Sequence, residues 1–137
     1  MSRANPSSPG KRIAVTGKGG SGKTMLTALI VRLLAEEGKR RILAIDADSA
    51  VGLCYALGLK PDRTVAEVRR QIIEEPSARS ELESIHIRAV MEELLLQGPG
   101  FQLLVMGRPE GPGCFCAVND LLRYGIDTLC RRFDLTL

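Results

Sequence analysis

The residues best suited to chemistry lie in one short segment, Gly17-Lys18-Gly19-Gly20-Ser21-Gly22-Lys23-Thr24. Its spacing fits the phosphate-binding pattern G-x-x-x-x-G-K-[ST]. The glycines allow successive backbone N–H groups to turn toward phosphate oxygens, and a helix starting here adds the positive end of its dipole. We expect the whole segment to bind nucleotide, with Lys23 neutralising the β- and γ-phosphates and the Thr24 hydroxyl ligating Mg²⁺.

The surroundings of this segment are those that a phosphate loop requires. An apolar run at 12–16 precedes it and predicts a buried strand, and a helical pattern follows from Thr24. The alternative is a glycine-rich turn that fits the pattern by chance. The strand–loop–helix order favours the phosphate loop.

A second lysine, Lys18, stands directly after the first glycine. The resulting GKGGSGKT resembles the deviant Walker A loop of the ParA/MinD/nitrogenase-iron-protein class of P-loop ATPases. The resemblance implies ATP as the nucleotide and a homodimer in which Lys18 reaches the partner subunit's nucleotide. Lys18 and Lys23 would then both act in catalysis. From the residues alone, the alternative for Lys18 is a solvated loop lysine.

Two carboxylates, Asp46 and Asp48, follow an apolar run at 41–45. Two residues apart in an extended segment, both point to the same side, at the sheet edge where open α/β folds bind ligands. One carboxylate can hold hydrated Mg²⁺ and the other can orient the water that attacks the γ-phosphate. In the resembled class this segment is switch I, usually D-x-D-P, which implies the magnesium role for Asp46 and the catalytic role for Asp48. The alternative is that Asp48 or Ser49 caps a helix at 50–57.

A pair of cysteines, Cys114 and Cys116, lies in a loop rich in glycine and proline at the start of a predicted helix. A helix N-terminus can lower the pKa of such thiols. One C-x-C supplies only two thiolates, which is too few for a Zn²⁺ or Ni²⁺ site, whereas a two-fold axis through the loop would supply four. A buried structural pair or a redox-active pair is the alternative.

The stretch GRPEGPGCFCAVN around these cysteines narrows the resemblance. It is similar to the signature of the CooC/AcsF-type nickel-insertion ATPases, which mature carbon monoxide dehydrogenase and acetyl-CoA synthase. The resemblance extends over residues 11–134. It implies a Ni²⁺ or Zn²⁺ ion shared by Cys114 and Cys116 of two subunits, ATP and Mg²⁺ as cofactors, and one of those two enzymes as client.

The apolar periodicity predicts alternating strands and helices. Strands are expected at 12–16, 41–45 and 101–106, with a further one opening at 133–137; helices are expected at 24–37, 50–57, 64–74, 81–96 and 117–131. This alternation predicts an α/β fold of the P-loop NTPase type, a parallel sheet with helices on both faces that is incomplete at the C-terminus. We expect residues 1–10 to be a disordered tail and residues 11–137 to be the N-terminal part of a P-loop ATPase domain.

Composition excludes several classes of function. The 137 residues suffice for one domain, and a net charge of +3 gives no basis for nucleic-acid binding. The sequence has no apolar stretch of bilayer length and no signal-peptide core at its start, so we expect no membrane binding and a cytoplasmic location. Cys54 and Cys130 lie in helical patterns and are expected to pack in the core.

The chain also departs from the family that it resembles. Members of that family continue past the equivalent of Phe133-Asp134 into a switch II segment, D-x-x-A-G, and an adenine pocket. We expect this chain to have the phosphate loop, switch I and the cysteine loop without those segments, and to expose strand edges. The sequence therefore leaves ATP hydrolysis undecided. The alternative functions are a ParA/MinD-like partition or positioning ATPase and a catalytically inactive fragment.

Overall fold

The computed structural model describes residues 10–74, 84–109 and 115–137. In chain order the elements are β1 (Lys11–Arg12), α1 (Lys23–Glu37), β2 (Ile42–Asp46), α2 (Gly52–Ala56), α3 (Val65–Glu74), α5 (Ser84–Glu93), β3 (Leu96–Gly98), β4 (Phe101–Val105), α6 (Phe115–Leu129), a 3-10 turn (Cys130–Arg132) and β5 (Leu135–Thr136). Residues 1–9 of the expected tail and residues 81–83 of an expected helix lie outside the described residues.

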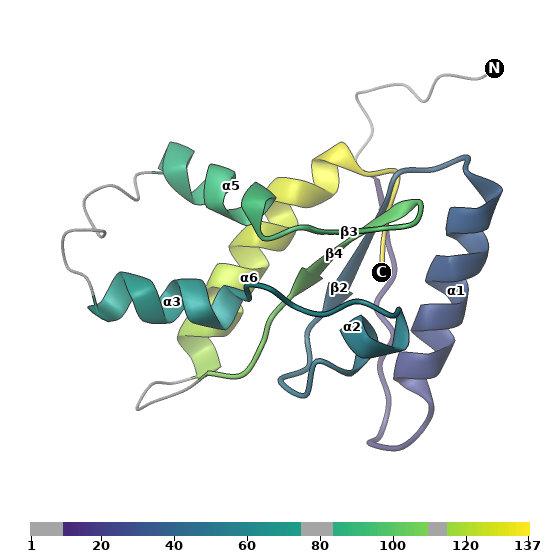
Figure 1. Ribbon diagram of the computed structural model, residues 1–137, viewed down its shortest axis with the longest axis horizontal. Coiled ribbons are helices and arrows are strands. Elements are labelled where there is room, and N and C mark those ends of the chain that lie inside the picture. Colours follow the sequence, from purple (N-terminus) through teal and green to yellow (C-terminus); the bar gives the residue numbers. More distant parts are fainter. Residues whose placement is uncertain (1–9, 75–83, 110–114) are drawn as a thin grey trace.

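One sheet organises these elements, in the strand order β1-β5-β2-β4-β3. The pairs β1/β5, β5/β2 and β2/β4 are parallel, and only β3 pairs antiparallel, with β4. Helices α1 and α2 lie on one side of the strands and α3, α5 and α6 on the other (Figure 1). The predicted α/β fold with helices on both faces is therefore confirmed.

Strand β2 is buried on both faces, as the unbroken apolar run predicts. Ile42 and Ala44 pack with α1 and α2, whereas Leu43 packs with α3, α5 and α6. This alternation follows from the two-residue period of a strand, which turns successive side chains to opposite faces. The sheet thus separates two apolar cores and presents Asp46, at its last position, to the end where the loops gather.

Local signals in the sequence set several helix ends. Helix α1 ends at Gly38, whose positive φ of 63° lets its N–H reach the carbonyl of Ala35. Thr64 and Glu67 form a capping box before α3: the backbone N–H of Thr64 donates to Glu67 Oε2 at 2.8 Å, and that of Glu67 donates to Thr64 Oγ1 at 3.3 Å. In the part of the chain that the structure describes, no helix is long and apolar enough to cross a membrane.

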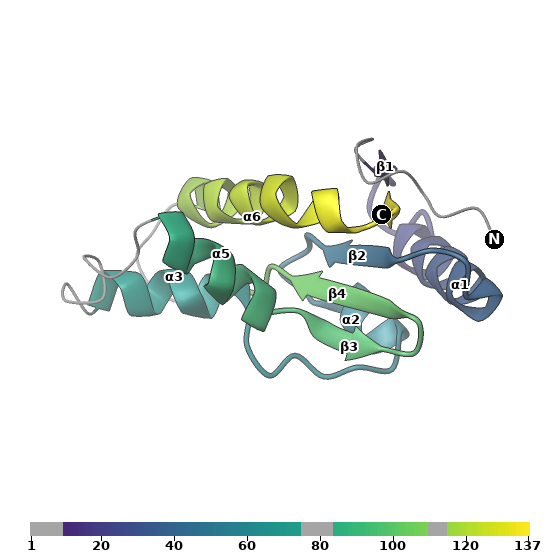
Figure 2. The same ribbon diagram turned by 90° about the horizontal axis from the view of Figure 1, so that it is seen from above.

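The expected buried strand at 12–16 is wrong. Strand β1 covers only Lys11–Arg12, and the Ile13 side chain that follows is 47% exposed. Its neighbour β5 is itself two residues long, so the ladder ends with the bond from the Ile13 N–H to the Thr136 carbonyl at 2.8 Å. β1 also lies at the edge of the sheet (Figure 2). An apolar pattern indicates which secondary structure a segment favours, but it does not indicate whether neighbouring strands bury that segment.

Three further boundaries differ from expectation. The helix expected at 50–57 is the shorter α2, and the helix expected to reach residue 96 ends at Glu93. Leu96–Gly98 instead forms β3, which pairs antiparallel with β4 across a turn at Pro99 and Gly100. The helix expected at 117–131 begins at Phe115 and tightens into a 3-10 turn at Cys130. Apolar runs of this length fit a helix or a strand equally well, so tertiary pairing decides.

Candidate functional site

The segment Gly17–Thr24 forms the turn between β1 and α1, as expected for a phosphate loop. Gly22 directly precedes the helix with a φ of 84°, and Gly20 has a φ of 77°. A side chain at either position would meet no atom within 4 Å, so backbone conformation and not crowding explains the need for glycine. Gly17 has a φ of 152°, whereas Gly19 and Ser21 lie exposed within the loop.

The two lysines of this loop are joined through its backbone. Lys23, the first residue of α1, donates from Nζ to the carbonyl oxygen of Lys18 at 2.9 Å. The N–H of Ser21 donates to the same oxygen at 3.2 Å. The Lys18 carbonyl thus closes the loop and orients the Lys23 ammonium, while the Lys18 side chain remains exposed.

Asp46 ends β2 and is almost fully buried, with 2% of the residue exposed. Its carboxylate accepts the backbone N–H of Cys54 at 3.0 Å and that of Asp48 at 3.3 Å. Burial raises the pKa of Asp46, although these backbone donors oppose the shift. A buried carboxylate with fixed orientation and a penalised charge is suited to binding a cation, because a cation would remove that penalty.

Asp48 is exposed and does not cap the following helix. Its Oδ1 accepts the N–H of Ala50 at 3.0 Å, and its carbonyl accepts the N–H of Val51 at 3.1 Å. Helix α2 starts only at Gly52, and its N-cap residue, Val51, makes no side-chain cap hydrogen bond. The capping interpretation therefore does not describe the geometry. The turn instead leaves the second oxygen of Asp48 available for a ligand.

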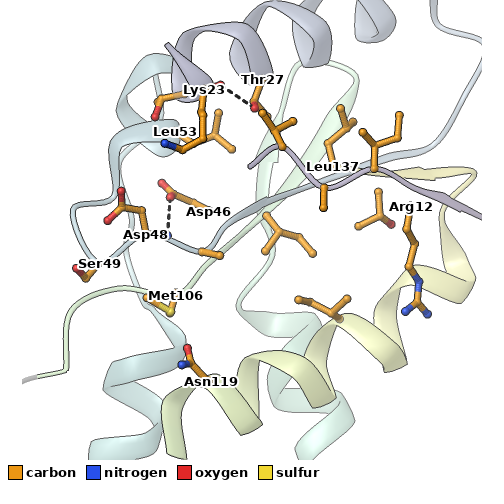
Figure 3. A pocket seen from close by; sticks show the side chains of 18 residues that line it. Arg12, Lys23, Thr27, Asp46, Asp48, Ser49, Leu53, Met106, Asn119 and Leu137 are labelled. Carbon is orange, nitrogen blue, oxygen red and sulfur yellow. Dashed lines mark hydrogen bonds between the residues drawn. The ribbon is translucent and has the colours of Figure 1, made fainter. Parts of the chain in front are cut away.

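Four of the predicted site residues line one cavity of about 800 Å³: Lys23, Thr24, Asp46 and Asp48. Figure 3 shows Lys23, Asp46 and Asp48 on the same side of this cavity. Thr24 also lies against Gly52, because a Cβ on that glycine would lie 3.5 Å from Thr24 Cγ2. One ammonium group, one hydroxyl and two carboxylates therefore face a common space, which is the donor set that a nucleotide phosphate with Mg²⁺ requires.

Asn119 also lines this cavity, from helix α6 on the opposite wall (Figure 3). Sequence reasoning assigned it no role. The sequence does contain a signal for its position near the cysteines. Residues three apart share a helix face, and Asn119 stands three residues after Cys116. Helix α6 thus links the cavity to the segment that carries Cys116. The backbone supplies a second link, because Met106, which begins the loop after β4, donates its N–H to the Asp46 carbonyl at 2.9 Å.

The cysteines have different surroundings. Cys116 is the second residue of α6 and is exposed, whereas Cys114 lies outside the described residues. Cys54 and Cys130 are buried, which confirms that both belong to the core; burial raises the pKa of the Cys54 thiol. Within residues 10–74, 84–109 and 115–137, no three His, Cys, Asp or Glu side chains cluster closely enough to hold a metal ion.

Comparison with known proteins agrees with the geometry of the loop and the sheet. The sequence profile of the CobQ/CobB/MinD/ParA nucleotide-binding domain matches residues 13–131. The chain belongs to this family. The match includes the phosphate loop, both carboxylates and the cysteine pair, so nucleotide binding is a property of the domain and not of an accidental motif.

Individual members of the family are similar over most of this chain. An uncharacterized ATP-binding protein of Methanocaldococcus jannaschii is 37% identical over 91% of the chain and 51% of its own length. The carbon monoxide dehydrogenase accessory protein CooC of Rhodospirillum rubrum is 33% identical over 82% of the chain and 47% of its own length. The antiactivator FleN of Pseudomonas aeruginosa is 37% identical over 67% of the chain and 28% of its own length. The chain thus spans about half the length of the first two relatives.

Proposed function

We propose that this chain is the N-terminal part of an ATP-dependent metal-insertion protein. Its cargo would be nickel, and its client would be carbon monoxide dehydrogenase or acetyl-CoA synthase. The observation that carries the proposal is the shared cavity: the phosphate-loop residues and the Asp pair line it on one side, and Asn119, three residues from Cys116, lines it on the other. The similarity to CooC, a carbon monoxide dehydrogenase accessory protein, supports the same assignment.

In this proposal the backbone of Gly17–Gly22 wraps the phosphates and Lys23 neutralises their charge. Thr24 and Asp46 hold Mg²⁺, which when bound screens the phosphate oxygens. Asp48 positions a water whose oxygen bonds to the γ-phosphorus while the bond from phosphorus to the ADP oxygen breaks. Lys18, exposed on the loop, reaches the nucleotide of a second copy, so the acting form is a homodimer. The proposed location of this dimer is the cytoplasm.

The metal in this proposal is cargo and not a resident cofactor. Cys114 and Cys116 from two subunits supply four thiolates, which suit Ni²⁺ or Zn²⁺ better than the two of one chain. Because each subunit completes the other's site, metal binding and dimer formation are linked. In this proposal, the effect of ATP binding beside Asp46 is transmitted to the cysteine loop by two contacts. One is the hydrogen bond from the Met106 N–H to the Asp46 carbonyl, and the other is α6, whose Asn119 lines the cavity.

The decisive experiment titrates Ni²⁺ and follows dimer formation by sedimentation. We expect one Ni²⁺ per dimer and a shift toward dimer, both lost in Cys114→Ala and in Cys116→Ala. Cys54→Ala is the matched control, because its side chain is buried and its backbone donor to Asp46 is unchanged. Full metal retention in the double variant Cys114→Ala/Cys116→Ala would defeat the nickel assignment and leave nucleotide binding intact.

The similarity to the antiactivator FleN supports a second candidate, a regulatory or positioning ATPase of the ParA/MinD class. It shares the phosphate site and differs in needing no metal at the cysteine loop. ATP-dependent dimer formation without bound Ni²⁺, and unchanged in the cysteine variants, would favour it. A chain that binds neither ATP nor Ni²⁺ would support the third candidate, an inactive fragment.

A further inference from the structure

A hollow of about 440 Å³ lies at the end of the sheet opposite the carboxylates. Strand β2 runs from Ile42, which lines this hollow, to Asp46, which lines the cavity described above, and four steps along a strand span roughly 13 Å. Figure 2 shows the C-terminal end of α6 and the starts of β2 and β4 at this same end of the sheet. The hollow is therefore separate from the candidate nucleotide site.

Three arginines line the hollow, and none of its lining residues in the described chain is acidic. Arg40 and Arg41 come from the turn between α1 and β2, and Arg132 comes from the 3-10 turn after α6. Their side chains are 48%, 65% and 52% exposed. The neighbouring Lys39 and Arg131 are exposed cations as well. Segments far apart in the sequence thus bring positive charge to one small space.

Each of these guanidinium groups is held from outside the hollow. Each has one acidic partner that does not line it: Glu92 for Arg132 at 2.7 Å, Glu37 for Arg40 at 3.7 Å and Asp134 for Arg41 at 2.9 Å. A guanidinium has five N–H donors, and these contacts use Nη1 of Arg40 and Arg132, and Nε and Nη2 of Arg41. The other terminal nitrogen of each arginine donates to no group within the described residues. The acids therefore orient the guanidinium groups and leave donors for a ligand.

Two glutamines add neutral donors to the lining. Gln97 of β3 and Gln102 of β4 stand directly opposite each other in the antiparallel ladder, so their side chains share one face of the sheet. Leu104, two residues after Gln102, packs in the core that contains α6, so this face is the one nearest Arg132. Side-chain amide N–H groups can donate to anionic oxygens beside the arginines. The hollow thus combines charged and neutral donors, as a site for an oxyanion requires.

We propose that this hollow binds a small anion carrying two or more negative oxygens, of the phosphate-ester or polycarboxylate class. A guanidinium fork matches two oxygens of a phosphate or carboxylate, and several forks around one ligand favour a multivalent anion over a singly charged one. A volume of about 440 Å³ suits a ligand of this size and not a folded partner. This inference does not depend on the nucleotide or the nickel assignment.

The test is a titration of the 137-residue chain followed by NMR of its backbone amides. Sodium phosphate and sodium citrate are the probes, at constant ionic strength, and sodium acetate is the singly charged comparison. We expect phosphate or citrate to shift the amides of Gln97, Gly98 and Gln102 saturably, and acetate to shift them weakly and without saturation. The amides of Gly17–Thr24 report separately on phosphate binding at the phosphate loop, so the two sites are distinguished.

Two substitutions identify the groups that bind. Arg40→Gln and Arg132→Gln should each raise the dissociation constant about fivefold or more, because each removes a charged fork whose contribution is reduced by its exposure to solvent. The double variant should not saturate. Arg123→Gln is the matched control, since Arg123 is an exposed arginine of α6 that does not line the hollow. Arg41 is left unchanged, because its bonds to Asp134 hold β5 beside β2.

Three results would overturn the proposal. One is equal, unsaturated shifts with phosphate, citrate and acetate, which would show charge screening and no site. Another is equal affinity in Arg40→Gln/Arg132→Gln and the unaltered chain. The third is a glutamate-rich peptide that binds at these amides about tenfold more tightly than citrate, because the occupant would then be an acidic segment of a protein. Saturable binding of phosphate alone or of citrate alone supports the proposal and identifies the class of anion.

Discussion

The ammonium group of Lys23 is already oriented by its own loop. Its donation to the Lys18 carbonyl, together with the bond from Ser21 N–H to the same oxygen, closes the loop. A lysine in this position loses little conformational entropy when it meets a phosphate, since its side chain is ordered beforehand. The cost is one hydrogen bond, which the phosphate replaces with a charge-assisted one.

The first prediction concerns Lys23. We expect Lys23→Ala to abolish ATP binding measured by titration calorimetry, because it removes the main positive charge facing the β- and γ-phosphates. Lys39→Ala is the control, since Lys39 is an exposed lysine outside the phosphate loop and its loss should change affinity little. Equal ATP affinity in Lys23→Ala and the unaltered chain would contradict the phosphate-loop assignment.

The second prediction concerns the protonation of Asp46. Its pKa is raised by burial, so the folded chain binds a proton more tightly than the unfolded chain does. In metal-free buffer this group therefore makes the free energy of unfolding fall as pH rises from the ordinary Asp pKa, about 3.9, through the raised value.

Asp46→Asn should remove that pH dependence, because the amide does not titrate. The measurement is denaturant unfolding of both proteins across this pH range, taking the difference between them so that other carboxylates cancel. A constant difference at every pH would show that burial does not penalise the Asp46 charge.

At the scale of elements, the sequence predicted helix ends that depend on a few adjacent residues. It did not predict strands whose existence or burial depends on pairing with other strands. The end of α1 at Glu37 and the start of α3 after Thr64 were predicted, because the cap chemistry at Gly38 and in the Thr64–Glu67 box is contained within a few residues. β3 was missed because apolar Leu94 and Leu95 continue a helical pattern until pairing with β4 overrides it. The buried strand at 12–16 was wrong for the same reason, since its burial depends on neighbouring strands.

In the candidate site, too, residues placed by local sequence were predicted and a residue placed by tertiary packing was not. Lys23, Thr24, Asp46 and Asp48 were identified from the sequence because each stands where a strand or loop ends, and the structure places them around one cavity. Asn119 was missed because its position depends on how α6 packs across the sheet. The roles assigned to these residues, and to Cys114 and Cys116, stay predictions.

The third prediction concerns the cap of α3. Thr64→Ala should lower the free energy of unfolding by about 1 kcal/mol, because it leaves the N–H of Glu67 without its side-chain acceptor. Thr64→Ser keeps the hydroxyl and should lose much less. Denaturant unfolding by circular dichroism measures both. A Thr64→Ser loss as large as that of Thr64→Ala would show that the methyl group and not the cap matters.

At the scale of the whole molecule, one ion pair joins the residue before β2 to the residue before β5. The Arg41 guanidinium binds both oxygens of Asp134, at 2.9 and 3.3 Å, and the Arg41 N–H donates to the same carboxylate at 2.8 Å. In return, the Asp134 N–H donates to the Arg41 carbonyl at 2.9 Å. This contact fixes β5 beside β2, the position on which the edge strand β1 depends.

The fourth prediction follows from this pair. The side-chain hydrogen bonds from Arg41 hold the pKa of Asp134 below its usual range. The stabilisation is therefore present above the ordinary Asp pKa and is lost as pH falls through the lowered value. Asp134→Asn should cost about 1–2 kcal/mol at neutral pH, and the difference should shrink in acid.

Asp127→Asn provides the comparison, because the Asp127 side chain is 55% exposed, against 25% for Asp134, and pairs with Arg12 through one bond of 2.8 Å. This substitution should cost at most about 1 kcal/mol. Chemical denaturation at several pH values measures both variants. Equal losses would mean that the multiple bonds to Arg41 add nothing to the stability of the sheet.

Val51, between Asp48 and α2, has a φ of 56° and is the one residue other than glycine with positive φ in the described parts of the chain. A β-branched side chain in this left-handed conformation costs roughly 1–2 kcal/mol. In evolutionary terms, glycine or asparagine at this position would remove the strain but also the apolar side chain that Val51 packs against the core beside α1 and α2. The strain and the packing gain are of similar size, so position 51 ties the turn after the carboxylates to the core. Selection can therefore relax this turn only together with substitutions that refill the core beside it.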